Sequence, residues 1–270
     1  MIPKIIHYCW FGGNPKNQEV LEYIETWKKY LPDYQIKEWS DKDLPLINNR
    51  YVTEAYQAKK WAFISDVFRL YALYNEGGIY FDTDIEVRKN FDEFLHLDFF
   101  IGSELYDNHK HFGTAVMGAA PKSKIIAEFL KEYDNIPFIK SNGKPDTTAN
   151  TTRLLKPLKE LGFKEIYSDN RPIYLDEKNA IFPVQYFSMD TPQSYAVHHF
   201  AASWVEPFRL KTKFFLPIGK KNYKLIKVRR NKQIKFNALP NAKILWHTDM
   251  QKNIFWLWVV ENKKIAREQI

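Results

Sequence analysis

The N-terminal part of the chain changes between the two periodicities that are typical of an α/β protein. Residues 2–11, rich in β-branched and aromatic side chains, predict a first strand that leads into a glycine-rich loop at 12–15. Apolar residues at helical spacing predict a helix over 17–30, which ends before Pro32. Residues 34–39 alternate as a strand does. This order is the opening of an α/β sheet, and the glycine loop after the first strand suggests a ligand crevice.

A long amphipathic stretch follows. Residues 54–76 predict the longest helix of the chain, which the glycine pair at 77–78 ends. Directly after it, a β-rich run over 79–87 carries two carboxylates at alternate positions. The pattern then predicts short strands and further helices: strands over 98–105 and 112–120, with His109 and His111 as loop residues between them, and helices over 123–133 and 148–161.

Composition indicates a folded globular protein. The chain has 270 residues, of which 45% are hydrophobic, enough for a substantial core. Its single cysteine, Cys9, excludes an intrachain disulfide and a thiolate zinc site, which suits a reducing compartment. Residues 1–13 are too short and polar for a signal peptide, and no run of 18 apolar residues predicts a membrane-spanning helix. We therefore expect a cytoplasmic protein.

The charge is unevenly distributed along the chain. The formal net charge is +8, yet residues 1–210 carry 25 basic and 29 acidic side chains. Residues 211–270 carry 15 basic and 3 acidic side chains, so this end is built to meet something anionic. We expect a main domain over 1–215 and a basic, aromatic-rich C-terminal subdomain over 216–270.

The two alternate carboxylates, Asp82 and Asp84, are the strongest candidate for chemistry. Residues two apart in a strand share one face, so both carboxylates are expected on one side where the strand leaves the sheet. Paired hard oxygen ligands suit Mn²⁺ or Mg²⁺, whose remaining ligands are often water and substrate phosphates. The alternative is a pair of solvated aspartates in a turn. Upstream, Asp66 and Arg69 share a helical face, either as an ordinary ion pair or as a grip on sugar hydroxyls.

Three separated segments resemble one known family. They are IPKIIHYCWFG at residues 2–12, AFISDVFRLYALYNEGGIYFDTDIEV at 62–87 and YAVHHFAASW at 195–204. They are similar to glycosyltransferase family 32, the DXD-containing sugar-binding type, and distantly to the glucosylating domains of large clostridial toxins. The resemblance frames roughly residues 1–205, and its middle segment is long and specific. It implies a GT-A fold with a mixed central sheet and a small C-terminal extension.

The resemblance also implies an activity. It is that of a metal-dependent, retaining glycosyltransferase that moves a sugar from a nucleotide-diphosphate donor, with UDP the best guess. The acceptor would be a glycan or a lipid-linked oligosaccharide in surface or capsular polysaccharide synthesis. Electrostatic stabilisation of the departing diphosphate would be the largest catalytic contribution. A front-face displacement needs no covalent nucleophile and is our preferred hypothesis.

The resemblance implies roles for residues of the first two segments. Trp10 would stack on the uracil or ribose of the donor. Asp66 and Arg69 would hold the transferred sugar. Asp82 would contact the ribose and the metal, and Asp84 would bind the metal directly. Trp10 has a second interpretation as a core aromatic residue.

For the last segment, the resemblance implies His199 as a late metal ligand, with His198 as the alternative. Trp204 would reach the leaving phosphate, unless it is a core aromatic. Ser203 would assist there, although its register against the toxin-like pattern is off by one position. Asn150 could reach the sugar or the acceptor, or could simply begin a helix.

The basic tail leaves two interpretations open. Residues 220–235 are rich in cations and 253–260 in aromatic side chains, which together suit docking on an anionic membrane, the inner face of the cell membrane. Alternatively, residues 253–260 form an amphipathic helix packed on the main domain. Two other function classes are alternatives: a noncatalytic protein that binds nucleic acid or an anionic surface, and a metal-dependent phosphodiester hydrolase. No recognisable nucleic-acid motif occurs, so we expect no nucleic-acid partner.

Overall fold

A computed structural model describes the chain over residues 1–106, 109–200, 208–218, 221–230, 242–247 and 254–262. The chain divides into two compact units, Met1–Ala201 and Ala202–Ile270. Residue 215, after which we expected the main domain to end, lies inside a strand of the second unit. The division into a main domain over 1–215 and a C-terminal subdomain over 216–270 stays a prediction.

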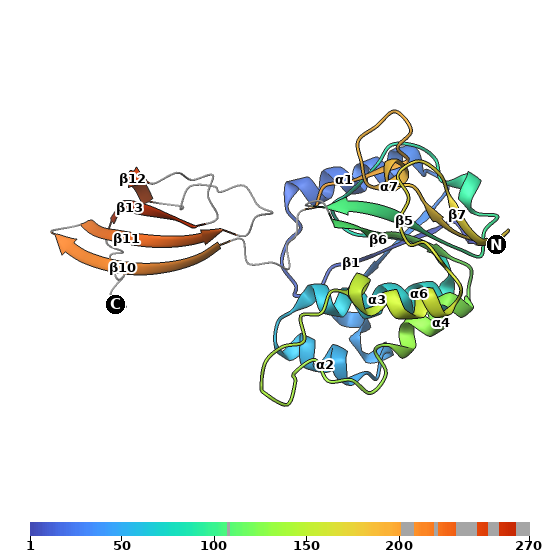
Figure 1. The fold of residues 1–270 in the computed structure, drawn as a ribbon, viewed down its shortest axis with the longest axis horizontal. Helices are drawn as coiled ribbons and strands as arrows, with labels where there is room; N and C mark the ends of the chain where they lie inside the picture. Colours follow the sequence, from blue (N-terminus) through green and yellow to red (C-terminus); the bar gives the residue numbers. More distant parts are fainter. Residues whose placement is uncertain (107–108, 201–207, 219–220, 231–241, 248–253, 263–270) are drawn as a thin grey trace. The chain divides into compact units, whose positions relative to one another are not determined.

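The first unit is built on a seven-stranded mixed sheet in the order β2-β1-β3-β6-β5-β8-β7 (Figure 1). Its strands are β1 (Ile5–Cys9), β2 (Gln35–Trp39), β3 (Gly78–Phe81), β5 (Phe99–Tyr106), β6 (His109–Ala119), β7 (Ile173–Asp176) and β8 (Asn179–Phe182). Strand β1 runs parallel to both β2 and β3. Strand β6 runs antiparallel to β3 and β5. The predicted mixed α/β architecture is therefore confirmed.

Helices cover both faces of this sheet and enclose two apolar cores (Figure 1). On one face lie α1 (Gln18–Tyr30) and α7 (Val184–Phe187), and on the other lie α3 (Trp61–Glu76), α4 (Lys124–Lys131) and α6 (Leu155–Glu160). The described residues also form α2 (Arg50–Gln57), which packs on α3, α5 (Asn150–Arg153) and the 3₁₀ turns Asp41–Leu46 and Asp92–Phe94. Trp27 of α1 and Phe68 of α3 are fully buried, one in each core. Burial of such aromatic side chains supplies much of the stability of a three-layer fold.

The predicted helix over 54–76 is wrong at its start. The structure has α2 and α3 in its place, separated by Lys59, whose φ of 54° a residue inside a helix does not adopt. The end was predicted correctly, because Gly77, at a φ of 66°, donates its N–H to the carbonyl of Leu73. The helix expected over 148–161 is likewise split, into α5 (Asn150–Arg153) and α6.

The predicted loop at His109 and His111 is also wrong. Both residues belong to β6, where they pair with Tyr106 and Glu104 of β5 in an antiparallel ladder. Strands β5 and β6 are thus longer than the hydrophobic pattern indicates. The sequence is polar from His109 to His111, so it does not show the alternation from which strands are predicted.

A two-stranded ladder lies beside the main sheet. Strand β4 (Ile85–Val87) follows β3 after a turn and pairs antiparallel with β9 (Ala196–His198). The register sets Ile85 opposite His198. This pairing brings residues 196–198 of the third family-like segment next to residues 85–87 of the second.

The second unit contains a four-stranded antiparallel sheet in the order β10-β11-β13-β12. Its strands are β10 (Phe208–Ile218), β11 (Lys221–Arg230), β12 (Ala242–His247) and β13 (Ile254–Asn262). The amphipathic helix that we considered for 253–260 is therefore wrong. Its residues are mostly aromatic and β-branched, which favours the strand that forms between β11 and β12.

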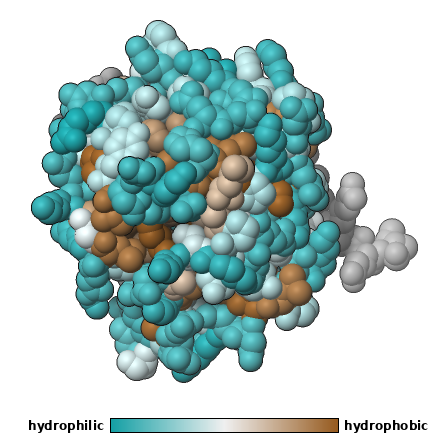
Figure 2. All heavy atoms as spheres, turned by 90° about the vertical axis from the view of Figure 1, so that its right-hand side faces the viewer, coloured by the Kyte–Doolittle hydropathy of each residue, from teal (hydrophilic) through white to brown (hydrophobic). Residues whose placement is uncertain are grey.

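The described surface is mixed in character. The face of the molecule in Figure 2 is mainly hydrophilic, with apolar side chains set between polar ones. In the second unit, the described side chains of Leu216, Ile218 and Leu245 are exposed. Across the described ranges, none of the helices has both the length and the apolar character needed to cross a bilayer.

Candidate active site

The two DXD carboxylates lie in the turn between β3 and β4. Strand β3 ends at Phe81, and Asp82 follows it directly, with its N–H donated to the carbonyl of Ala115 on β6 (2.8 Å). Thr83 and Asp84 form the turn that leads to β4. We predicted that strand alternation sets the two carboxylates on one face, but β3 ends at Phe81, before either aspartate. The turn, rather than the pleat, positions Asp84.

Arg69 is the centre of the buried part of the site. It projects from α3 with 6% of its side chain exposed, and its guanidinium lies 3.0 Å from Asp66 Oδ1 and 3.3 Å from the carboxylate of Asp82. It also donates to the carbonyl of Thr114 on β6 (2.8 Å) and lies over the ring of Tyr80. One buried cation thus connects the predicted sugar-binding Asp66 with the first aspartate of the DXD motif.

Asn150 joins the same network from α5. Its amide donates to Asp66 Oδ1 and to Thr114 Oγ1, both at 2.8 Å, and the residue is buried. Asn150 is the first residue of α5, but its side chain does not cap that helix. The structure therefore brings Asn150 to Asp66 and Arg69, and its predicted contact with sugar or acceptor stays a prediction.

Burial controls the protonation of these carboxyls. For Asp66, burial raises the pKa to about 6, although the charge of Arg69 opposes that rise. For Asp82, burial and the neighbouring charge of Asp84 raise the pKa, while Arg69 and His198 lower it. Removal of charged carboxylates from water is costly, so a site with several of them close together needs the cation of Arg69.

His198 lies next to Asp84. Because β9 pairs with β4, its imidazole Nε2 comes within 3.4 Å of Asp84 Oδ2, and its Nδ1 lies 3.0 Å from Glu104 Oε1. Burial lowers the pKa of His198, but the charges and hydrogen bonds of Glu104 and Asp84 outweigh that effect and raise the pKa well above its ordinary value.

His199 points to a different partner. Its Nε2 lies 3.0 Å from Glu86 Oε2, and its ring stacks on Tyr23 of α1. Only its backbone N–H reaches Asp84, at the carbonyl oxygen (3.1 Å). Of the two histidines, the arrangement favours the alternative that we kept, His198, as the side chain beside Asp84. The ligand role of either one stays a prediction.

The chemistry of these groups fits a divalent cation that is bound together with a phosphate ligand. Within the described ranges, no three His, Cys, Asp or Glu side chains converge as a ready-made metal cage. The carboxylates of Asp82 and Asp84 are both partly exposed, at 29% and 16%. Mg²⁺ and Mn²⁺ are commonly held by one or two carboxylates, with water and substrate phosphates as further ligands. The residues present fit such an ion.

The remaining predicted residues are less closely connected. Trp10 follows β1 and is half-buried, with its indole N–H donated to the carbonyl of Asn14 (2.6 Å) and the ammonium of Lys16 above its ring. Its stacking role stays a prediction. Ser203 and Trp204 lie outside the described residues.

Two contributors to the site were not predicted from the sequence. Thr114 holds both Arg69 and Asn150, and Glu104 holds His198. Each lies within a strand that was predicted, but nothing in the local pattern marks it as functional. The pairing of β5 with β6 and of β6 with β3 brings Thr114 and Glu104 to the site. The sequence pattern does not show that pairing.

The comparisons with known proteins agree with this arrangement. Residues 17–100 match the family described as a glycosyltransferase sugar-binding region containing a DXD motif. That range contains Asp66 and Arg69 together with Asp82 and Asp84. Over these residues the chain is similar to the sugar-binding region of DXD-containing glycosyltransferases. The prediction of a glycosyltransferase enzyme is confirmed, and the noncatalytic and hydrolase alternatives no longer apply. The predicted mixed sheet is present, and its assignment to the GT-A type stays a prediction.

Two relatives of this glycosyltransferase extend the comparison. It is 27% identical over 231 residues to an uncharacterized glycosyltransferase of Acanthamoeba polyphaga mimivirus, which covers 80% of this chain and 88% of the relative. It is 32% identical over 107 residues to inositol phosphoceramide mannosyltransferase 3 of Schizosaccharomyces pombe, which covers 35% of this chain but only 28% of that protein.

Two solved structures are more distantly similar to the glycosyltransferase. The PaToxG glycosyltransferase has 22% identity and a TM-score of 0.45, with 60% of this chain and 72% of that one covered. A glycosyltransferase involved in glycosylation of the major capsid of PBCV-1 has 11% identity and a TM-score of 0.41, with 74% and 95% covered. Similarity at this level adds no argument about the substrate.

Proposed function

We propose that this glycosyltransferase is a metal-dependent, retaining enzyme that takes a sugar from a UDP-sugar donor. The observation that carries the proposal is the continuous set of contacts from Asn150 through Asp66 and Arg69 to Asp82, beside the contact of Asp84 with His198. Side chains that can hydrogen-bond to sugar hydroxyls thus lie next to a turn whose carboxylates can bind a cation. A nucleotide-sugar donor requires both kinds of group.

Each part of this set has a proposed task. Asp66 and Arg69, with Asn150 beside them, accept and donate hydrogen bonds to the hydroxyls of the transferred sugar. Asp82 adds a contact to the ribose. Trp10 stacks on the uracil. Positions fixed in advance by protein contacts lower the entropic cost of orienting the donor.

The diphosphate would lie at the other end of the set. Asp82 and Asp84, with His198 in preference to His199, would hold Mn²⁺ or Mg²⁺. When bound, the ion supplies positive charge to the departing diphosphate. Ser203 and Trp204 are proposed to donate hydrogen bonds to the same group.

A front-face displacement suits the carboxylates of the site. Asp66 is held by Arg69 and Asn150, and Asp82 by Arg69 and Tyr80, so neither is placed as a separate nucleophile. In the proposed step, the acceptor hydroxyl oxygen forms a bond to the anomeric carbon as the bond from that carbon to the diphosphate breaks. The hydroxyl proton passes to a departing phosphate oxygen, and both changes occur on one face of the sugar.

The acceptor is proposed to be a glycan or a lipid-linked oligosaccharide in surface or capsular polysaccharide synthesis. The name of one relative places its mannosyl transfer on inositol phosphoceramide, which is a lipid. The excess of basic side chains in residues 211–270 suits an anionic membrane, so we also propose peripheral docking at the inner face of the cell membrane. Nucleic acid is not expected as a partner.

A donor screen tests the proposal. The protein is incubated with UDP-glucose, UDP-galactose, UDP-N-acetylglucosamine and GDP-mannose, each with Mn²⁺ or with a chelator, and with or without a mixture of sugar acceptors. We expect nucleotide release from a UDP-sugar that requires Mn²⁺ and rises when an acceptor is added. Release from GDP-mannose alone would contradict the choice of nucleotide. Equal release with the chelator would contradict the metal requirement.

A further inference from the structure

Glu104 is a buried carboxylate beside the site to which no role has yet been given. It lies on β5 with 8% of the residue exposed, and its Oε1 is 3.0 Å from Nδ1 of His198. The other ring nitrogen, Nε2, faces Asp84 Oδ2 at 3.4 Å. The imidazole of His198 is therefore held between two carboxylates, one on β5 and one in the turn before β4.

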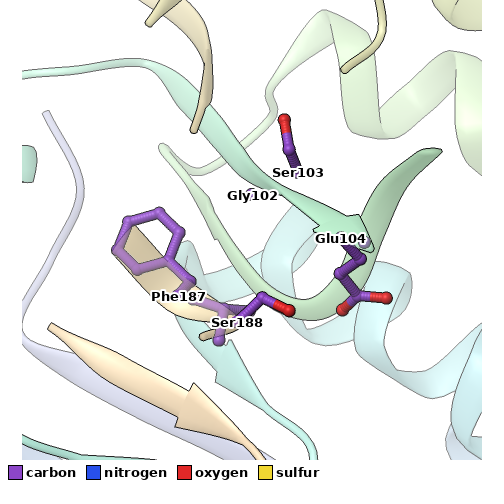
Figure 3. Close-up of a pocket in the computed structure, with 7 residues that line it drawn as sticks. Gly102, Ser103, Glu104, Phe187 and Ser188 are labelled. Carbon is purple, nitrogen blue, oxygen red and sulfur yellow. The ribbon is translucent and has the colours of Figure 1, made fainter. Parts of the chain in front are cut away.

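The neighbouring strand leaves room for this carboxylate. Gly113 lies on β6, and a Cβ added at that position would collide with the carboxylate of Glu104. Figure 3 shows that Glu104 turns its carboxylate toward Ser188, across a narrow pocket lined also by Gly102 and Phe187. The carbonyl oxygen of Ser188 accepts the backbone N–H of His198 (3.2 Å). The ring and the backbone of His198 are thus both fixed from this one pocket.

We propose that Glu104 is a positioning residue for His198, and that Gly113 provides the space it needs. This inference rests on the proposed function, because it concerns the metal side of the donor site. When Nδ1 donates its proton to Glu104, Nε2 is the nitrogen that faces Asp84 and can bind a cation there. A carboxylate behind a ligating histidine fixes the ring orientation and makes the ligand more basic.

The adjacent histidine supplies a matched control. Glu86 lies 3.0 Å from Nε2 of His199, so this pair repeats the distance between Glu104 and His198. Glu86 is also bound by Arg88 (2.8 Å), and His199 stacks on Tyr23 rather than facing Asp84 with its ring. Loss of either glutamate removes one carboxylate from a histidine, but only Glu104 acts on the histidine beside Asp84.

The experiment is a Mn²⁺ titration at saturating UDP, monitored by isothermal titration calorimetry. It compares the wild type with Glu104→Ala, Glu104→Gln, Gly113→Ala and Glu86→Ala. We expect Glu104→Ala to raise the half-saturating Mn²⁺ concentration about 10- to 100-fold. Glu104→Gln keeps an acceptor oxygen for Nδ1 and should recover part of the loss. Gly113→Ala, which displaces the carboxylate without removing it, should resemble Glu104→Ala. Glu86→Ala should stay within about twofold of the wild type.

A kinetic measurement accompanies the titration. At limiting Mn²⁺, Glu104→Ala should lower kcat more than it raises the KM for the donor, and excess Mn²⁺ should restore much of the rate. A merely structural role would instead lower the melting temperature without shifting the Mn²⁺ requirement, and that outcome overturns the inference. Equal effects of Glu86→Ala and Glu104→Ala overturn it as well. If the wild type does not bind Mn²⁺ with UDP, both the proposed function and the role of Glu104 are overturned.

Discussion

The two halves of the candidate site are built differently. Around Arg69, side chains from α3, β6 and α5 hold one another in a buried network. Around Asp84, a turn and the short ladder of β4 with β9 bring a histidine to the carboxylate. The Arg69 side is thus fixed before any ligand arrives, because its side chains are ion-paired or hydrogen-bonded to one another. Under the proposed function, the Asp84 side would exchange its protein contacts for those of an incoming ion and phosphate.

The largest expected effect comes from Asp84→Ala on the open side. We expect kcat to fall by about 10³-fold or more, because the charge that stabilises the departing diphosphate is lost. The melting temperature should fall less than in a variant of Arg69, because His198 keeps Glu104 as a partner when Asp84 is removed. Rate measurements on the screened donor, with a thermal melt as the control, check this. A rate close to that of the wild type would contradict the site.

On the closed side, Arg69→Met should damage both activity and stability. It leaves Asp66 and Asp82 without their buried cation, and a broken buried pair costs about 3–5 kcal/mol. Urea unfolding measures that loss, while Asp84→Ala serves as the comparison. If both variants unfold at the same urea concentration, the contrast between the two sides is wrong.

A pH dependence sharpens the contrast. The pKa of Asp66 is about 6 in the folded protein against an ordinary 3.8, so the folded state binds the proton more tightly. The resulting stability is fully present below pH 3.8 and is lost as the pH rises through 6. Relative to Asp66→Asn, which does not titrate, the wild type should lose about 2 kcal/mol between pH 4 and pH 7. A difference in unfolding free energy that does not change with pH would contradict the burial of this carboxyl.

The smallest expected effect is that of Asn150→Ala. It removes the amide that donates to Asp66 and Thr114, which should cost about 1–2 kcal/mol in unfolding free energy. If Asn150 also touches the sugar, kcat/KM should fall about tenfold, mostly through KM. The matched control is Asn49→Ala, which removes the amide that caps α2 far along the chain from the DXD turn. A loss of stability equal to that of the control, with kcat/KM unchanged, would limit Asn150 to a structural role.

Elements that local sequence determines were predicted well. The first strand, α1 and the end of α3 at Gly77 follow from alternation, helical spacing and the glycine beyond a helix end. The strand β13 was missed because aromatic and β-branched runs fit either helix or strand, and pairing with β11 and β12 decides between them. The break at Lys59 was missed because no glycine or proline marks it in the sequence.

The site shows the same limit. Asp66, Arg69 and Asp82 lie within one continuous block of sequence, so the block indicates that they act together. The choice between His198 and His199 could not be made locally. In a strand one of two successive residues faces inward, but which one depends on the register of β9 against β4. Glu104 was missed for a similar reason, since it reaches His198 across 94 residues of sequence.

The most direct test of the central claim is a thermal-shift measurement of UDP with Mn²⁺, compared with UDP alone and with Mn²⁺ alone, on the wild type and Asp84→Ala. A ligand that binds only the folded state raises the melting temperature. The account predicts a rise for the wild type only when UDP and Mn²⁺ are present together, and no such rise for Asp84→Ala. An equal rise in both proteins, or a wild-type rise with UDP that does not need Mn²⁺, would contradict it.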